Sequence, residues 1–211
     1  MKPNRDMEED VTLLRVPRSV NKRPWKIISG GQTGVDRAGL VAAMSYCIPF
    51  GGWVPKGRLA EDGVVPENFY ALWECDGGYR ERTRANVDSS DATLILVDRL
   101  PLSGGTAYTA EYAAKQGKPC KTVDLNAEDA EVQIREWMLS LESTTVPAEK
   151  KQVVLNVAGP RESGSPGIFE KAKKVLRHVF AVFRNGSGGD ICDIDANGTL
   201  YGWISSDLIK S

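Results

Sequence analysis

The strongest constraint on the fold is a unit of apolar run, glycine-rich turn and helical pattern that occurs three times. The first unit, residues 25–40, reads WKIISGGQTGVDRAGL, so a short apolar run passes through glycines directly into a helix. The second and third units span residues 92–116 and 152–183. Runs as apolar as ATLILV at residues 92–97 are typical of strands buried on both faces. The alternation predicts a doubly wound, Rossmann-like α/β fold with a mainly parallel sheet and helices on both faces.

The length of 211 residues suits one domain with appendages. Residues 1–22 mix charges of both signs with little periodicity and are expected to form a flexible N-terminal arm. Residues 23–184 form the predicted Rossmann-like ligand-binding domain. Residues 185–211 are predicted to be a C-terminal β-hairpin appendage, because the turn-forming pair Asn197-Gly198 separates two apolar-rich runs.

Residues 48–66 interrupt the alternation of strands and helices. The segment IPFGGWVPKGRLAEDGVVP combines glycine, proline and both signs of charge, which predicts a long loop after a short strand. Loops of this length inside a compact domain are often functional. Lys56 and Arg58 are cations suited to phosphate, and Trp53 could stack on a flat ring. The alternative is an ordinary charged loop.

Composition restricts the partners. A formal net charge of -1, with 26% charged residues, argues against the broad basic surface that nucleic acids require. No apolar run approaches the length of a membrane span, and the first residues lack the apolar core of a signal peptide. We therefore expect a soluble, cytoplasmic protein that contacts neither membrane nor nucleic acid.

No metal site is expected from the sequence. The 4 cysteines are scattered and form neither a CxxC pair nor a Cys/His pattern, which suits reduced thiols. Asp193, Asp195 and Asn197 followed by Gly198 imitate the start of a calcium loop. The twelfth position, however, is Ile204 rather than the required glutamate.

The three glycine turns are expected at one edge of the sheet, because ligands of such folds bind at the carboxyl ends of the strands. Glycines permit close approach of the backbone, and the helix that follows offers unpaired N–H groups to a phosphate. The first turn matches neither the GxGxxG fingerprint nor a P-loop. The expected binding residues are Gly30, Gly31, Gln32, Thr33, Gly34, Asp36, Trp53, Lys56, Arg58, Ser103, Gly104, Gly105, Thr106, Arg161 and Ser163.

Six segments carry a resemblance to a known family. They read IISGGQTGVDRAGL, GGWVPKGRLAEDG, RTRANVDSSDATLILVD, LSGGTAYTAEYA, GKPC and LNVAGPRESGSPGI. Together they closely resemble the molybdenum carrier family, within the lysine-decarboxylase-like Rossmann proteins that include the cytokinin-activating phosphoribohydrolases. The resemblance implies a homo-oligomer, a dimer or tetramer, that carries or stores the molybdenum cofactor, molybdopterin, a phosphate-bearing pterin. It also implies a molybdoenzyme as the acceptor.

The hydrolases of this group suggest an alternative function. They have a PGGxGTxxE turn, and a catalytic arginine eight residues before Ser-Asp-Ala. This chain keeps Arg82 ahead of Ser90-Asp91-Ala92, and Glu111 at the matching distance after Gly104-Gly105, but Ala107-Tyr108 replaces the Gly-Thr. If the protein were a nucleotide N-glycosidase or phosphoribohydrolase, Arg82 and Glu111 would be its catalytic residues.

We expect a binding protein rather than an enzyme. A third hypothesis is that the protein is a sensor of nucleotide-derived signals, which would bind a nucleotide in place of the pterin.

Overall fold

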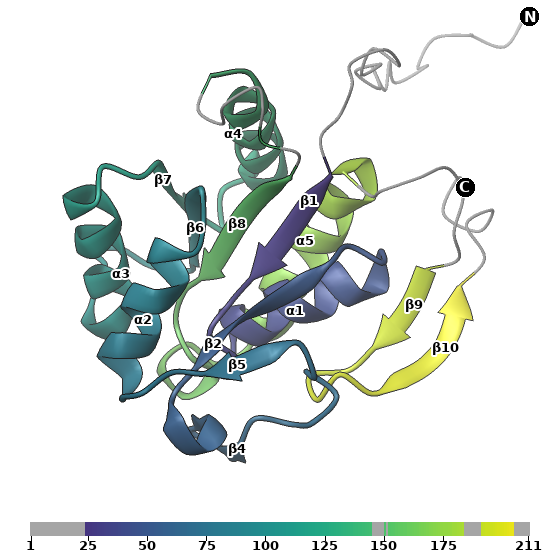
Figure 1. Ribbon diagram of the computed structural model, residues 1–211. Helices are drawn as coiled ribbons and strands as arrows, with labels where there is room; N and C mark the ends of the chain where they lie inside the picture. Colours follow the sequence, from purple (N-terminus) through teal and green to yellow (C-terminus); the bar gives the residue numbers. More distant parts are fainter. Residues whose placement is uncertain (1–23, 145–149, 151, 184–190, 205–211) are drawn as a thin grey trace, which may run out of the picture.

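A six-stranded parallel sheet forms the centre of the molecule, with the strand order β5-β2-β1-β8-β6-β7 (Figure 1). The computed structural model describes residues 24–144, 150, 152–183 and 191–204, so the predicted N-terminal arm lies outside the described residues. The strands of the sheet are β1 (Trp25–Ile28), β2 (Phe50–Val54), β5 (Leu72–Glu74), β6 (Ala92–Val97), β7 (Cys120–Asp124) and β8 (Val153–Ala158). The predicted parallel α/β sheet is confirmed.

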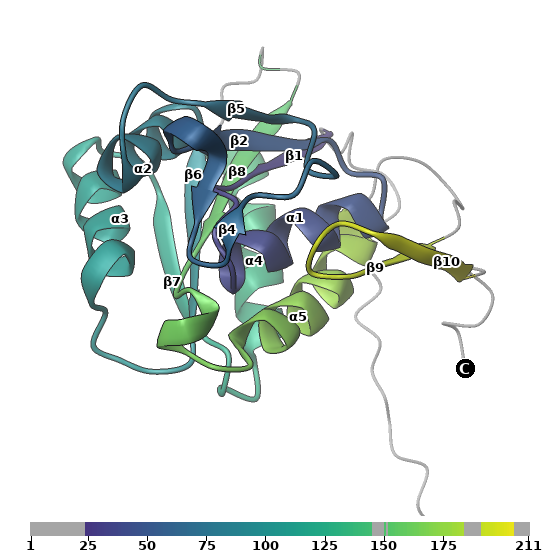
Figure 2. The same cartoon turned by 90° about the horizontal axis from the view of Figure 1, so that it is seen from below.

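Helices cover both faces of the sheet (Figure 2). Helices α1 (Val35–Ser45), α4 (Ala130–Thr144) and α5 (Ile168–Phe183) pack together on one face, and α2 (Tyr79–Asp88) packs beside α3 (Gly104–Lys115) on the other. No helix in the described part of the chain is long and apolar enough to cross a membrane.

The core follows from the apolar patterns of the individual elements. Every residue of β6 is buried, as expected of a central strand with helices on both sides. In α5 the apolar positions recur at helical spacing, so one face is buried while lysines occupy the other. Trp25 of β1 meets Phe183 of α5 edge to face, with ring centroids 5.5 Å apart.

The prediction of a continuous loop over residues 48–66 is wrong for its first part. Residues FGGWV form β2, which pairs with β1 on one side and β5 on the other. Gly52, with φ 128°, allows the close approach of the neighbouring strand, because a Cβ there would lie 2.1 Å from the carbonyl oxygen of Ser29. The 3₁₀ turn η1 (Lys56–Arg58) and a short hairpin of β3 (Leu59–Ala60) and β4 (Gly63–Val64) follow.

The predicted C-terminal hairpin is present. Strands β9 (Ile191–Ile194) and β10 (Leu200–Ile204) pair antiparallel, and Gly198 has the left-handed backbone, φ 77°, that this turn needs. β9 packs beside α1, and Asn68 Nδ2 donates a hydrogen bond to the carbonyl oxygen of Asn197, 3.3 Å away. The hairpin is thus attached to the domain on the side opposite α3.

Candidate functional site

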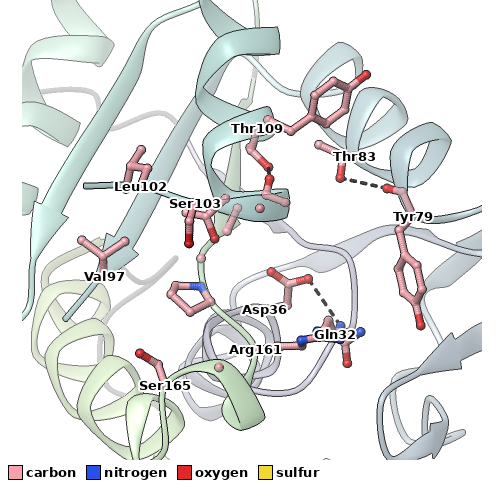
Figure 3. A pocket seen from close by; sticks show the side chains of 18 of the residues that line it. Gln32, Asp36, Tyr79, Thr83, Val97, Leu102, Ser103, Thr109, Arg161 and Ser165 are labelled. Atoms are coloured by element: carbon pink, nitrogen blue, oxygen red, sulfur yellow. Dashed lines mark hydrogen bonds between the residues drawn. The ribbon is translucent and has the colours of Figure 1, made fainter. Parts of the chain in front are cut away.

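A cleft of about 740 Å³ lies at the carboxyl ends of β1, β6 and β8. In the sheet, β2 lies on one side of β1, and β6 and β7 lie on the other side. The strand β8, which comes last of these strands in the chain, lies between β1 and β6. This reversal is the kind of switch point at which open α/β sheets bind ligands. Figure 3 shows side chains from several separate segments facing the cleft. Its walls come from residues 32–36, helix α2, residues 97–109 and residues 158–165.

The start of α3 is the clearest anion-binding feature of the cleft. Ser103, Gly104, Gly105 and Thr106 all line it, and no side chain of the described residues caps the helix. The first N–H groups of a helix have no intrahelical acceptor and carry the positive end of the dipole. Gly104 has a φ of 55°, in the left-handed region that glycine adopts most readily. At Gly105 an added Cβ would meet no atom of the described residues within 4 Å, so the missing side chain leaves open space beside these donors.

A buried ion pair forms the floor of the cleft. Arg82 Nη1 lies 3.1 Å from Asp36 Oδ2, with side chains only 13% and 4% exposed. The N–H of Gln32 donates to the same oxygen over 3.3 Å (Figure 3). Burial raises the pKa of Asp36 above its ordinary value, although Arg82 and the Gln32 N–H favour the charged form. Arg82 Nε is also buried, and no group of the described chain accepts a hydrogen bond from it.

Further arginines surround this floor. Arg80, Arg99 and Arg161 also line the cleft, and all three are exposed. Arg99 donates to the carbonyl oxygen of Gly164 and, over 3.2 Å, to Ser165 Oγ, which ties the turn after β6 to the turn after β8. With Arg82 they give the cleft four guanidinium groups. Three of them are paired with carboxylates, Arg82 with Asp36, Arg99 with Asp98 and Arg161 with Glu61, of which Asp36 alone lines the cleft, so the lining itself favours an anionic ligand.

The first glycine turn is mostly closed by the protein itself. Of the residues predicted there, Gln32 and Asp36 line the cleft, whereas Gly30, Gly31, Thr33 and Gly34 do not. The Val35 N–H donates to the carbonyl oxygen of Pro160, and a Cβ on Gly34 would lie 2.5 Å from that oxygen. These glycines therefore allow one turn to pack against another, and the structure offers the turn less to a ligand than its sequence suggests.

The predicted contacts from the β2–β5 connection lie away from the cleft. Trp53 Nε1 donates to Ser89 Oγ over 2.9 Å, and Lys56 is exposed on η1. Arg58 ties the connection together, because its guanidinium group donates to four carbonyl oxygens of the same segment, those of Val65, Pro66, Phe69 and Leu72. Trp53, Lys56 and Arg58 do not line the cleft.

Thr33, Arg161 and Ser163, which were predicted to bind the ligand, lie together around the carboxylate of Glu61, a residue that was not among the predicted binding residues. The carboxylate of Glu61 accepts hydrogen bonds from Thr33 Oγ1 and from the N–H and hydroxyl of Ser163, and lies 3.4 Å from Arg161 Nε. The sequence feature that points to Glu61 is the acidic pair Glu61-Asp62, which lies between two apolar residues and a glycine. Arg99 was also not predicted; its signal was an arginine two residues after the buried strand.

The fold separates Arg82 from Glu111, the two residues that match the catalytic pair of the hydrolases. Arg82 lines the cleft, whereas Glu111 is exposed on α3 and does not line it. Tyr108 borders the cleft where the hydrolase pattern has threonine, and its hydroxyl accepts a hydrogen bond from Arg84 Nε over 2.6 Å. His178 is remote from the cleft and lies 2.7 Å from Glu131.

Comparisons with known proteins cover the elements that build this cleft. The model of the circularly permutated YpsA SLOG family matches residues 27–180. Among solved structures, a crystal structure described as "Putative molybdenum carrier protein" from Syntrophus aciditrophicus SB has 44% sequence identity and a TM-score of 0.66. The match covers 75% of this chain and 96% of that one. No curated protein matches the sequence significantly.

Proposed function

The chain belongs to the circularly permutated YpsA SLOG family, and we propose that its cleft binds a small phosphate-bearing ligand and holds it without converting it. The observation that carries this proposal is the start of α3. There no side chain of the described residues caps the helix, and a Cβ on Gly105 would meet none of their atoms within 4 Å. A phosphate placed there would accept from the backbone N–H groups and lie within the field of the surrounding arginines.

The position of Asp36 supports a second property of the proposed ligand, a ring with N–H groups. A buried carboxylate in a cleft rich in arginine can accept hydrogen bonds from the N–H groups of a ring, which a phosphate alone does not have. A pterin has such N–H groups and a flat ring. Together with the relative described as a molybdenum carrier, this supports the molybdenum cofactor, a pterin that bears a phosphate, as the ligand carried or stored.

Binding of the purified cofactor tests this function directly. Molybdenum cofactor released from a molybdoenzyme is added to the protein under nitrogen, and its affinity and its lifetime after exposure to air are measured. We expect saturable binding and a longer lifetime, both lost in Gly105→Leu, which fills the open space beside the α3 donors. Glu111→Gln serves as the control, since Glu111 lies outside the cleft. Absence of both binding and protection would refute the proposal.

A phosphoribohydrolase is the second candidate, favoured by the position of Arg82 in the cleft. Two features weigh against it: Glu111 is exposed outside the cleft, and Arg82 is paired with Asp36. Nucleoside monophosphates incubated with the protein should therefore release no free base. Release that disappears in Glu111→Gln would favour the enzyme over the carrier.

We also propose, from the family resemblance, that the protein acts in the cytoplasm as a homo-oligomer and passes its ligand to a molybdoenzyme. Trp73 on the edge strand β5 and Tyr70 just before it are 69% and 78% exposed and provide apolar surface for such contacts. Analytical ultracentrifugation measures the oligomeric state, and a monomer at micromolar concentration would contradict this part of the proposal.

A further inference from the structure

The carboxylate of Glu61 reaches from the β3–β4 turn to donors on two other segments. Oε1 accepts from Thr33 Oγ1 and from the Ser163 N–H, 3.0 Å away. Oε2 accepts from Ser163 Oγ and lies 3.4 Å from Arg161 Nε. Two hydroxyl groups, one backbone N–H and one guanidinium group around two oxygens form a donor set that would equally suit a phosphate.

The charged form of Glu61 is the one that this environment stabilises. Its side chain is 16% exposed. Partial burial raises the pKa of Glu61, but the hydrogen bonds from Ser163 and Thr33 and the charge of Arg161 outweigh burial and bring the pKa below its ordinary value. The donors are thus arranged for a negative charge, whether the protein or a ligand supplies it.

This donor set adjoins the main cleft. Arg161 lines the cleft and also lies against Glu61, and Gln32, another lining residue, accepts a hydrogen bond from the Glu61 N–H over 2.9 Å. We propose that Thr33, Arg161 and Ser163 form a second oxyanion subsite, which Glu61 occupies in the free protein and leaves when an anionic group of the ligand enters.

The hairpin that carries Glu61 is built so that this carboxylate can leave. Strands β3 and β4 have two residues each, and the side chains of Leu59 and Val64 are 52% and 63% exposed. Only the small side chain of Ala60 is buried in this hairpin, so little packing is lost when the turn moves. The next residue, Asp62, is held separately by a bidentate pair with the buried Arg37, at 2.6 and 2.7 Å. Glu61 can therefore turn away while Asp62 keeps the hairpin attached.

Phosphate binding after removal of the Glu61 side chain tests the subsite. Every variant in this experiment also carries Gly105→Leu, which blocks the proposed phosphate site at the start of α3 without adding charge. In this background, Glu61→Ala should bind inorganic phosphate at least about tenfold more tightly by calorimetry, with a saturable rise in Tm. Adding Arg161→Gln should abolish the gain. Glu67→Ala, which removes an exposed acid from the same connection, is the control and should leave phosphate binding unchanged.

Equal phosphate affinity with and without Glu61→Ala, or a gain that survives Arg161→Gln, would overturn the subsite. If Glu61→Ala does not fold, Glu61→Gln keeps the shape and removes the charge, and should still bind phosphate more tightly than the Gly105→Leu parent; no gain there would also overturn it. The outcome is separate from that of the proposed function, which depends on the cofactor binding and protection lost between the wild-type protein and Gly105→Leu.

Discussion

The guanidinium group of Arg82 lies directly against the backbone of Gly30, so that a Cβ added to this glycine would be 2.2 Å from Arg82 Nη1. The same nitrogen lies 3.1 Å from Asp36 Oδ2 at the floor of the cleft. The absence of a side chain at Gly30 is therefore what allows α2 to place its arginine beside the carboxylate of α1.

Gly30→Ala should displace Arg82 and break its ion pair with Asp36. Overpacking of this kind costs about 1–3 kcal/mol, and we expect the free energy of unfolding to fall by that amount. Binding of the phosphate-bearing ligand should weaken at the same time. Urea unfolding and calorimetry measure the two effects, and an unfolding free energy equal to that of the wild type would show that Arg82 moves aside without cost.

Gly105→Ala should have the opposite effect on stability. The new Cβ meets open space, and alanine is a better helix former than glycine by up to about 1 kcal/mol. We therefore expect unchanged or higher stability, but weaker ligand binding, because the methyl group enters the cleft beside the α3 donors. Thermal unfolding with a parallel binding titration separates the two. If Gly105→Ala binds the ligand with the same affinity as the wild type, the phosphate binds elsewhere.

Arg58→Lys tests whether this predicted ligand residue is structural. A lysine cannot reproduce the fork that reaches four carbonyl oxygens, so some of them lose their partner. The free energy of unfolding should fall by about 1–3 kcal/mol. Ligand affinity should stay within about twofold of the wild type, because Arg58 lies outside the cleft. A large loss of affinity with full stability would restore its predicted role in binding.

The contribution of Glu61 to stability should depend on pH. Because the folded pKa of Glu61 is below its ordinary value of 4.5, its contribution is complete above pH 4.5 and is lost as the pH falls through the folded value. Glu61→Gln should therefore be less stable than the wild type at neutral pH, with a difference that shrinks below pH 4.5. Urea unfolding between pH 7 and pH 3 measures this. A difference between Glu61→Gln and the wild type that stays constant over this pH range would contradict the lowered pKa.

The fold could be predicted wherever the pattern was local. The run ATLILV at residues 92–97 became the buried strand β6, and the turn at Gly104-Gly105 became the start of α3 within the cleft. The segment FGGWV could not be recognised in this way. Its glycines resemble a turn, and they are tolerated in a strand only because β1 and β5 lie on either side of it.

The sequence by itself determined the α/β class and the three units in which a buried strand passes through a glycine turn into a helix, because apolar periodicity and glycine placement act over a few neighbouring residues. Only the tertiary structure decided which glycine turn leaves its backbone donors open to the cleft. The N–H of Val35 after the first turn is taken by the carbonyl oxygen of Pro160, whereas the start of α3 has no side-chain cap within the described residues and faces open space. Whether a backbone donor is free depends on acceptors brought from distant parts of the chain.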